Sequence, residues 1–284
     1  MPKKKLMIHD LLIMKKEKKP ITWLTSYDYP TAQFAEAAGL DMILVGDSLG
    51  MCVYGYEGTN PVTMDQCITH CDAVRRAAPN TFVMGDMPFM SYQISDEDAV
   101  ANAGRFIKEA SVDAVKLEGG KRITSRISAI VDAGIMVCGH IGLTPQSSGQ
   151  QGGHKAQGRT VEAAETLIED AMAIEAAGAH LILLEAIPPE VAGFIREKLI
   201  IPVYGIGVGT DVDGQLLIIS DLIGQFQAFT PKFVKKYANV AEVVTNAIKA
   251  YVDDVQKGTF PEDKHCYHML KGETEKFQEL TKKY

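Results

Sequence analysis

The most constraining feature of this sequence is a repeated order of segments. Four times, a helical stretch that ends in small residues, most often glycine, is followed at once by a short apolar run and then by polar residues or glycine. These four runs are 42–47, 114–118, 136–140 and 181–185. Glycine ends helices because it tolerates the left-handed conformation, and short runs without polar alternation are typical of strands buried on both faces. The order predicts alternating helices and parallel strands.

Counting every such run gives eight strands, and most of the intervals between them have a helical pattern. The strands are expected at 21–26, 42–47, 82–86, 114–118, 136–140, 181–185, 202–206 and 215–220. Only the interval between the seventh and eighth is too short for much helix. Eight alternating units in 284 residues predict an α/β protein with a single (β/α)₈ TIM barrel. An open doubly wound sheet is the alternative, but the glycines at 205–209 precede no helix, so dinucleotide binding is not expected.

We expect the whole chain, residues 1–284, to form this one barrel domain with a helix added at each end. An amphipathic stretch from Leu6 to Met14 predicts an N-terminal helix that packs on the body of the protein. Residues 240–256 and 273–284 predict a C-terminal helical extension, which is expected to pack around the barrel or against another subunit.

Composition excludes several classes of partner. A net charge of −7 and a pI of about 5.5 argue against nucleic acid. The sequence contains no apolar run of transmembrane length, so no membrane partner is expected. The cysteines number five, an odd count in apolar or helical contexts, which indicates reduced thiols in a cytoplasmic protein.

Polar residues end five successive predicted strands, at the positions where TIM barrels carry their active sites. Any one of them could be a helix cap or a member of a buried ion pair. Five in succession predict a shared site. The residues, in chain order, are Asp47 and Ser48, Asp86, Lys116 and Glu118, His140, and Glu185.

Three of these residues, Asp47, Asp86 and Glu118, are carboxylates that would repel one another in one barrel mouth unless protons or a cation relieve the repulsion. Oxygen ligands without nearby cysteines favour Mg²⁺ or Mn²⁺. A 2-oxo acid can chelate such a metal, which then polarises the keto group and stabilises an enolate. The pattern therefore predicts a metal site for enolate chemistry.

The remaining residues have expected roles around this metal. Lys116 lies two residues from Glu118, so both face the barrel interior, and Lys116 with Ser48 could hold a substrate carboxylate. Glu185 follows a wholly apolar run and suits proton transfer. His140 is expected to contact the substrate or shuttle protons, although a structural histidine fits equally well.

The long polar segment 144–160 is a candidate lid over the mouth. Its cationic side chains, His154, Lys155 and Arg159, could meet an anionic cosubstrate. A solvated surface loop would give the same sequence.

These motifs make the chain resemble the 3-methyl-2-oxobutanoate hydroxymethyltransferase family, also called ketopantoate hydroxymethyltransferases. The resemblance extends from about residue 22 to residue 261, and several of its motifs occur in the same order. The matching stretches are 44–51, 85–90, 115–120, 138–146, 184–185, 205–207, 213–215 and 258–261.

The resemblance implies a barrel of the phosphoenolpyruvate/pyruvate-like type and a one-carbon transferase. Its reaction would move a hydroxymethyl group from 5,10-methylenetetrahydrofolate to 3-methyl-2-oxobutanoate, through a Mg²⁺-stabilised enolate. The product would be 2-dehydropantoate, in pantothenate and coenzyme A biosynthesis. The family also implies a homo-oligomer, most often a decamer.

The resemblance further implies a role for each matching residue. Asp47 and Asp86 would bind Mg²⁺, with Glu118 at the metal or just outside its ligand shell. Asp47, Ser48, Asp86 and Lys116 would contact the oxo acid, and Glu185 would accept its proton.

Other chemistries remain compatible with the residues alone. A metal-dependent 2-oxo-acid aldolase or lyase of the related barrel superfamily would use the same enolate. A Schiff-base aldolase would use Lys116 as its nucleophile. A barrel that only binds a ligand would have no need for the set of Asp47, Asp86 and Glu185.

Overall fold

The computed structural model describes residues 4–284, so Met1, Pro2 and Lys3 of the predicted domain lie outside the described residues. The chain divides into two compact units, one ending at Tyr237 and the other running Ala238–Tyr284. The second unit coincides with the expected C-terminal helical extension. The assignment of the whole chain to one domain stays a prediction, and each unit is described by itself.

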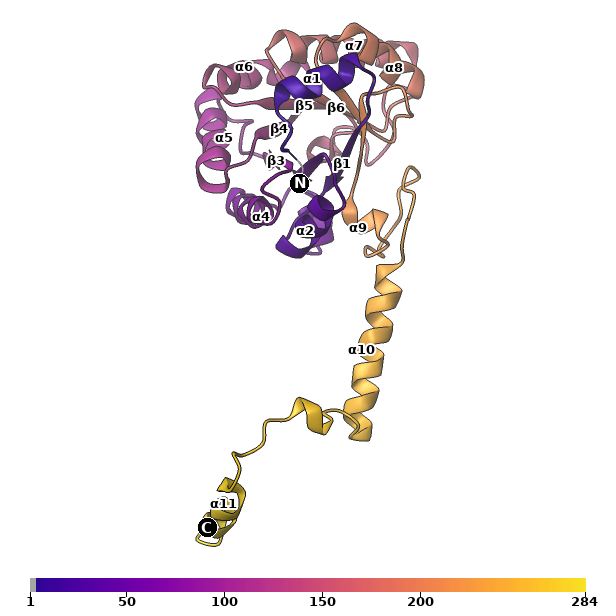
Figure 1. Cartoon of the computed structure of the whole chain (residues 1–284). Helices are drawn as coiled ribbons and strands as arrows, with labels where there is room; N and C mark the ends of the chain where they lie inside the picture. The colour runs from indigo at the N-terminus through magenta and orange to yellow at the C-terminus, as the bar shows by residue number, and fades with distance from the viewer. Residues whose placement is uncertain (1–3) are drawn as a thin grey trace. The chain divides into compact units, whose positions relative to one another are not determined.

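The first unit is built on a closed barrel of parallel strands, in which each strand pairs with the next and β8 pairs with β1 (Figure 1). Closure confirms the predicted (β/α)₈ barrel and rules out the open sheet. The strands are β1 Ile21–Thr25, β2 Met42–Val45, β3 Phe82–Asp86, β4 Ala114–Glu118, β5 Val137–Gly142, β6 Leu181–Glu185, β7 Val203–Ile206 and β8 Gly214–Leu217.

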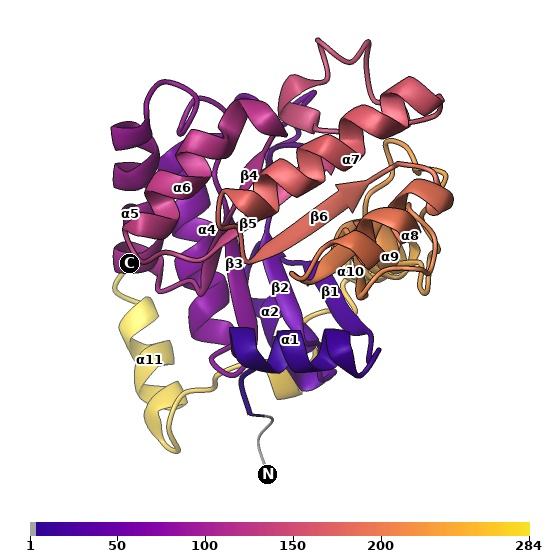
Figure 2. The same cartoon turned by 90° about the horizontal axis from the view of Figure 1, so that it is seen from above.

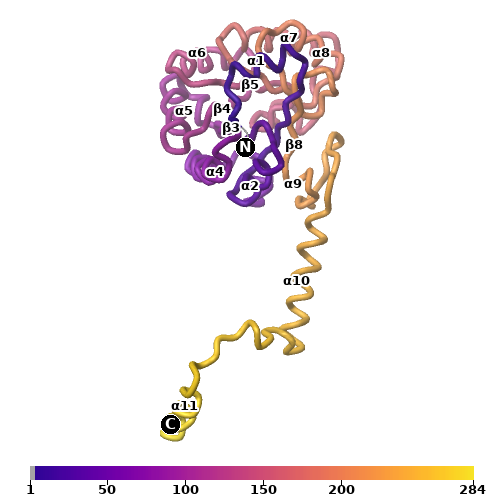
Figure 3. The backbone as a smooth tube through the Cα atoms, viewed as in Figure 1, coloured from indigo at the N-terminus to yellow at the C-terminus, as the bar shows by residue number. Residues whose placement is uncertain are grey.

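Helices surround the strands, as the tube in Figure 3 follows from α2 to α8. The side chains of Asp28, Ser95 and Thr160 cap α2, α5 and α7 by accepting a backbone hydrogen bond. Within the described chain no helix lies between β7 and β8, as the short interval predicted. The helices are α2 Tyr29–Ala37, α3 Leu49–Cys52, α4 Met64–Ala77, α5 Asp96–Ala110, α6 Thr124–Asp132, α7 Val161–Ala176, α8 Pro189–Lys198 and α9 Ile219–Leu222.

The strands separate two apolar cores because successive side chains point to opposite faces. Val115 and Leu117 of β4 belong to the outer core, between strands and helices. Ala114 belongs to the inner core. Lys116 and Glu118 follow Ala114 at intervals of two, so they share its inward face, as the sequence predicted. The polar site therefore lies above an apolar barrel interior.

Helix α1 (Ile8–Lys16) lies at the end of the barrel where the strands begin (Figure 2). Its Leu11 and Met14 are buried in the inner core. Lys15 Nζ donates to the carbonyl of Ile201 at 2.9 Å and pairs with Asp213 at 3.1 Å. The helix lies where the sequence predicts one, and these contacts hold it against the end of the barrel opposite the site.

The second unit contains the two helices expected from the sequence, α10 Val240–Lys257 and α11 Glu273–Thr281. None of their residues is buried. Large apolar side chains repeat along α10 at intervals that place them on one face. These residues, which we call the α10 apolar face, are Val244, Ile248, Tyr251, Val252 and Val255. Within the described chain no helix is long and apolar enough to cross a membrane.

Candidate functional site

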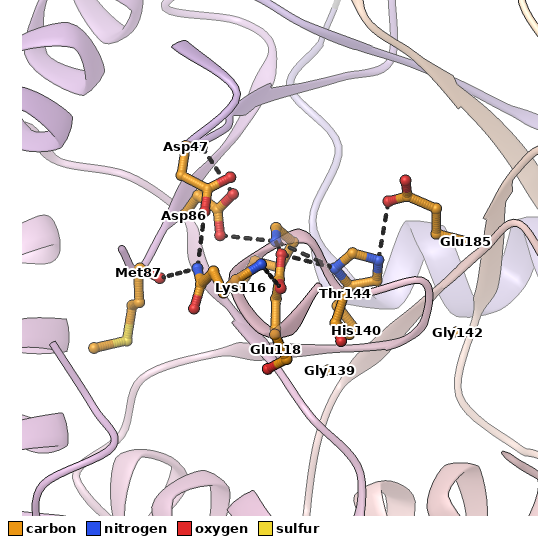
Figure 4. A network of polar contacts seen from close by, with 12 residues as sticks. Asp47, Asp86, Met87, Lys116, Glu118, Gly139, His140, Gly142, Thr144 and Glu185 are labelled. Carbon is orange, nitrogen blue, oxygen red and sulfur yellow. Dashed lines mark hydrogen bonds and ion pairs between the residues drawn. The ribbon is translucent and has the colours of Figure 1, made fainter. Parts of the chain in front are cut away.

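The polar residues at the ends of β2 to β6 meet in one mouth of the barrel (Figure 4). Contacts run without a gap from Asp47 to Asp86, Lys116, Glu118, His140 and finally Glu185. Ser48 lies beside this chain, with its Oγ 2.8 Å from Tyr27 Oη. The structure thus brings together all the residues that the sequence selected from five separate strands.

Asp47 and Asp86 are adjacent, buried carboxylates. The backbone N–H of Asp47 donates to Asp86 Oδ2 at 2.9 Å. Asp86 Oδ1 lies 2.8 Å from the Lys116 ammonium, but within the described chain it has no well-directed hydrogen-bond donor. Burial and then the charge of Asp86 raise the pKa of Asp47 well above its ordinary value. The pair therefore needs additional positive charge.

Lys116 is the cation at the centre of the network. Its Nζ lies 2.8 Å from Asp86 Oδ1, 3.2 Å from Glu118 Oε1 and 3.4 Å from His140 Nδ1. Burial opposes the charge, but Asp86, Glu118 and Asp47 outweigh it and raise the pKa of Lys116 well above its ordinary value. An ammonium has no free electron pair, so this environment disfavours Lys116 as a Schiff-base nucleophile.

Glu118 has its oxygens fully engaged. Oε1 faces Lys116 and His140, and Oε2 accepts the backbone N–H of Gln146 at 3.0 Å. Burial favours protonation, but the charge of Lys116 and the contact with His140 lower the pKa of Glu118 to about 2. Glu118 is thus an ionised carboxylate that balances Lys116, which fits a place just outside a metal's own ligands.

His140 connects this network to Glu185, whose Oε2 lies 3.2 Å from His140 Nε2. Burial and then Lys116 oppose protonation of His140, yet its contacts with Glu118 and Glu185 raise its pKa to about 9. The side chain of Glu185 is 16% exposed, whereas those of His140 and Glu118 are 2% and 1% exposed. Glu185 is less buried than its apolar run suggested.

Two residues of the network, Gln146 and Tyr92, were not found from the sequence. Gln146 Nε2 donates to Asp47 Oδ2 at 2.9 Å, and its own N–H donates to Glu118. The Tyr92 hydroxyl donates to Gln146 Oε1 at 2.7 Å. Gln146 ends one of the motif stretches, which was the available signal, whereas nothing in the pattern marked Tyr92.

The residues present fit a magnesium ion. Among residues 4–284, no three histidine, cysteine or carboxylate side chains form a complete metal-binding group. Mg²⁺ needs no such cage, because it is commonly held by one or two carboxylates, waters and substrate oxygens. Asp47 and Asp86 supply two carboxylates, and Asp86 Oδ1, which pairs with the Lys116 ammonium, accepts no well-directed hydrogen bond within the described chain.

The candidate lid, residues 144–160, contacts the mouth through Gln146 and Gln151. Gln151 Nε2 donates to the carbonyl of Gly142 at 2.8 Å, and Gln151 Oε1 accepts from the Thr144 N–H at 3.1 Å. With the contact of Gln146 to Glu118, these hydrogen bonds fasten the start of the segment at the ends of β4 and β5, and its role as a lid stays a prediction.

Comparison with known proteins identifies close relatives. The model of the family described as ketopantoate hydroxymethyltransferase matches residues 5–263. A 3-methyl-2-oxobutanoate hydroxymethyltransferase from Alkaliphilus metalliredigens is 64% identical over 281 residues, covering 99% of each chain.

Solved structures with the same fold are much more distant in sequence. A phosphonopyruvate hydrolase in complex with oxalate and Mg²⁺ superposes with a TM-score of 0.60 at 13% identity, covering 97% of this chain and 96% of that one. A 2,3-dimethylmalate lyase of the PEP mutase/isocitrate lyase superfamily gives 0.58 at 16% identity, covering 92% and 91%. At this identity they show the fold alone, a closed barrel like the one described above.

We predict that Lys116→Met lowers the free energy of unfolding by about 3–5 kcal/mol, because the substitution leaves buried carboxylates without their cation. The measurement is urea unfolding at pH 7 with a chelator present. Lys121→Met is the matched control, because Lys121 is exposed and pairs only with surface Glu169, and it should change stability little. Equal small effects of both substitutions would contradict the account of Lys116.

Proposed function

Since the chain belongs to the ketopantoate hydroxymethyltransferase family, we propose that its barrel mouth is the site where 3-methyl-2-oxobutanoate is deprotonated and hydroxymethylated. The chain is a hydroxymethyltransferase of pantothenate biosynthesis. The observation that carries the proposed site is the unbroken set of contacts from Asp47 and Asp86, through Lys116, to Glu185. These contacts connect the two carboxylates proposed to bind the metal with the partly exposed carboxylate of Glu185.

The proposed metal is Mg²⁺, held by Asp47 and Asp86, with Glu118 beside it. When bound, the metal draws electron density from the keto group of the oxo acid and so acidifies its C3–H. The raised pKa of Asp47 supports this assignment, since burial and the neighbouring charges of Asp86 and Glu118 make a second cation beside this carboxylate favourable.

The chain's own residues orient the oxo acid in the proposed site. The Lys116 ammonium and the Ser48 hydroxyl bind its carboxylate, and His140 lies beside it. The hydrogen bond between Tyr27 and Ser48 supports the second contact, because it fixes the Ser48 side chain next to Asp47.

Glu185 is the proposed base. Its carboxylate takes the C3 proton, the electrons of that C–H bond form the C2–C3 double bond, and the C=O π electrons move to the oxygen to give an enolate. Water breaks both C–N bonds of the methylene group of the proposed cosubstrate, 5,10-methylenetetrahydrofolate, which releases the carbon as formaldehyde while tetrahydrofolate leaves with the two hydrogens of that water. C3 of the enolate then bonds to the formaldehyde carbon, and the formaldehyde oxygen takes the proton held by Glu185 to become the hydroxyl group. The contact with His140 and the partial exposure of Glu185 support this role, since together they orient the carboxylate and leave it accessible.

The alternative enzyme, a 2-oxo-acid aldolase or lyase, has only a distant likeness of fold in its favour. In the lyase alternative a cysteine would act as the catalytic acid, and Cys138 would be that cysteine. Cys138 lies in the inner core, where burial raises its pKa to about 12. The structure offers no observation that favours this alternative over the transferase.

We also propose a cytoplasmic homo-oligomer, a decamer in its full form. All five cysteines are free, and three are buried, which suits a reducing compartment. The α10 apolar face supports assembly, because exposed apolar patches of this kind mark protein–protein contacts.

Chelation should abolish activity, and added Mg²⁺ should restore it. The measurement is formation of 2-dehydropantoate from 3-methyl-2-oxobutanoate and 5,10-methylenetetrahydrofolate after EDTA treatment, with pyruvate and acetaldehyde as control substrates. The expected result follows from the need to neutralise Asp47 and Asp86 and to polarise the keto group. Full activity after chelation would eliminate the metal site.

Glu185→Gln should retain binding of the oxo acid yet slow exchange of its C3 proton in deuterated water by about a hundredfold or more, because the amide cannot accept the proton. Proton NMR follows the exchange without any cosubstrate. Glu190→Gln, a change in a nearby acidic residue of α8, is the control and should leave exchange intact. Unimpaired exchange in Glu185→Gln would remove Glu185 as the base.

Light scattering should give a particle much larger than the 31.0 kDa chain. Joint substitution of Ile248 and Val252 by aspartate should reduce its mass, because charges then interrupt the α10 apolar face. Asn246→Asp adds a charge on the opposite side of the helix and should leave the mass unchanged. A monomeric native protein would refute the assembly.

A further inference from the structure

Two cavities lie over the ends of β4 and β5 and share one wall. The first, of about 400 Å³, begins at Ile141 and Gly142 of β5. The second, of about 480 Å³, reaches Glu118 and Gln146 in the catalytic mouth. Both volumes fall in the range of small-molecule sites, roughly 300–1,000 Å³. The residues common to the two walls are Arg122, Ser147 and Gln150.

Arg122 is a cation without a charged partner in this shared wall. Its guanidinium donates only to neutral oxygens, those of Gln150 and Ser147. No carboxylate lies within ion-pair distance of it in the described part of the chain. The adjacent cations differ, since Lys121 pairs with Glu169 and Arg126 pairs with Asp96.

The free donors of Arg122 suit an anion of planar shape. A guanidinium has five N–H donors in a fixed fork, which matches a carboxylate in a bidentate way. Two of these donors are used in the contacts with Ser147 and Gln150. A carboxylate in either cavity would therefore find both charge and unused donors.

We propose that Arg122 binds a carboxylate of the glutamyl tail of the tetrahydrofolate cosubstrate. The inference rests on the proposed function, in which this cosubstrate brings its methylene group to the oxo acid. The oxo acid's own carboxylate has Lys116, whose side chain is only 3% exposed inside the mouth. Arg122 is exposed at the outer side, where the far end of a long cosubstrate must lie if its pterin end reaches the mouth.

The cations first expected to meet an anionic cosubstrate, His154, Lys155 and Arg159, line neither of these two cavities. Arg122 comes instead from the short 3-10 helix after β4, Lys121–Ile123, a segment that the sequence did not select. Arg122 is therefore the proposed contact for the carboxylate of the cosubstrate.

A rival explanation is that Arg122 only fastens the lid through Ser147 and Gln150. The two roles predict different effects of an Arg122 substitution on the oxo-acid site. Gln146 lies in the same turn as Ser147 and contacts both Asp47 and Glu118. Loss of a fastener would therefore weaken the oxo-acid site as well, whereas loss of an anion contact would affect the cosubstrate alone.

The test compares Arg122→Gln, Arg122→Lys and the control Lys108→Gln in the full-length, Mg²⁺-loaded enzyme; Lys108 is an exposed cation that lines neither cavity. We expect Arg122→Gln to raise the Kd of tetrahydrofolate and the KM of its methylene form roughly tenfold to a hundredfold, the effect of one charge-assisted contact. Arg122→Lys should recover part of the loss, and Lys108→Gln should bind normally. The KM of the oxo acid and C3 exchange without cosubstrate should stay unchanged.

A ligand control isolates the tail. 6-Methyltetrahydropterin keeps the pterin ring but has no carboxylate, so its inhibition constant should be the same for native enzyme and Arg122→Gln. If native enzyme binds tetrahydrofolate and Arg122→Gln binds it equally well, or if oxo-acid binding weakens in parallel, the role of Arg122 is overturned. If native enzyme binds no tetrahydrofolate, the proposed cosubstrate fails together with this inference.

Discussion

The buried ammonium of Lys116 is the interaction on which the site depends. Three carboxylates lie in one barrel mouth, and two of them, Asp86 and Glu118, contact this cation directly. Without this cation, the side chains of Asp86 and Glu118, which end β3 and β4, could not both stay ionised next to each other at neutral pH. Glu118 in turn holds His140, and His140 contacts Glu185. One charge thus arranges both ends of the site.

Much of the fold was predictable because a barrel strand is a local pattern. The apolar runs that the sequence marked are the observed strands, with ends that differ by at most three residues. The side-chain alternation within β4 is sufficient to assign Lys116 and Glu118 to the inward face of the barrel. The carboxyl ends of barrel strands meet in one mouth. That rule alone was enough to predict that Asp47, Asp86 and His140 lie near one another.

The missed residues depend on loops that return to the site over long sequence distances. Gln146 and Asp47 are 99 positions apart, and their contact follows from how segment 144–160 folds back, which has no periodic signal. Tyr92 likewise lies in an irregular segment and Arg122 in a short 3-10 helix, and in both the position of the side chain is set by tertiary contacts. The exposure of Glu185 was not predicted because the apolar pattern of β6 describes only neighbouring residues in the sequence. It does not describe how much space lies above the end of the strand.

Helix α1 has a consequence for how small molecules reach the site. Leu11 and Met14 pack into the barrel interior from the end where the strands begin, so small molecules approach the mouth from the opposite end. In the proposed reaction both reactants would use that one entrance. The oxo acid, which the proposal places deeper, between Lys116 and Glu185, would then bind before the cosubstrate, and its product would leave after it.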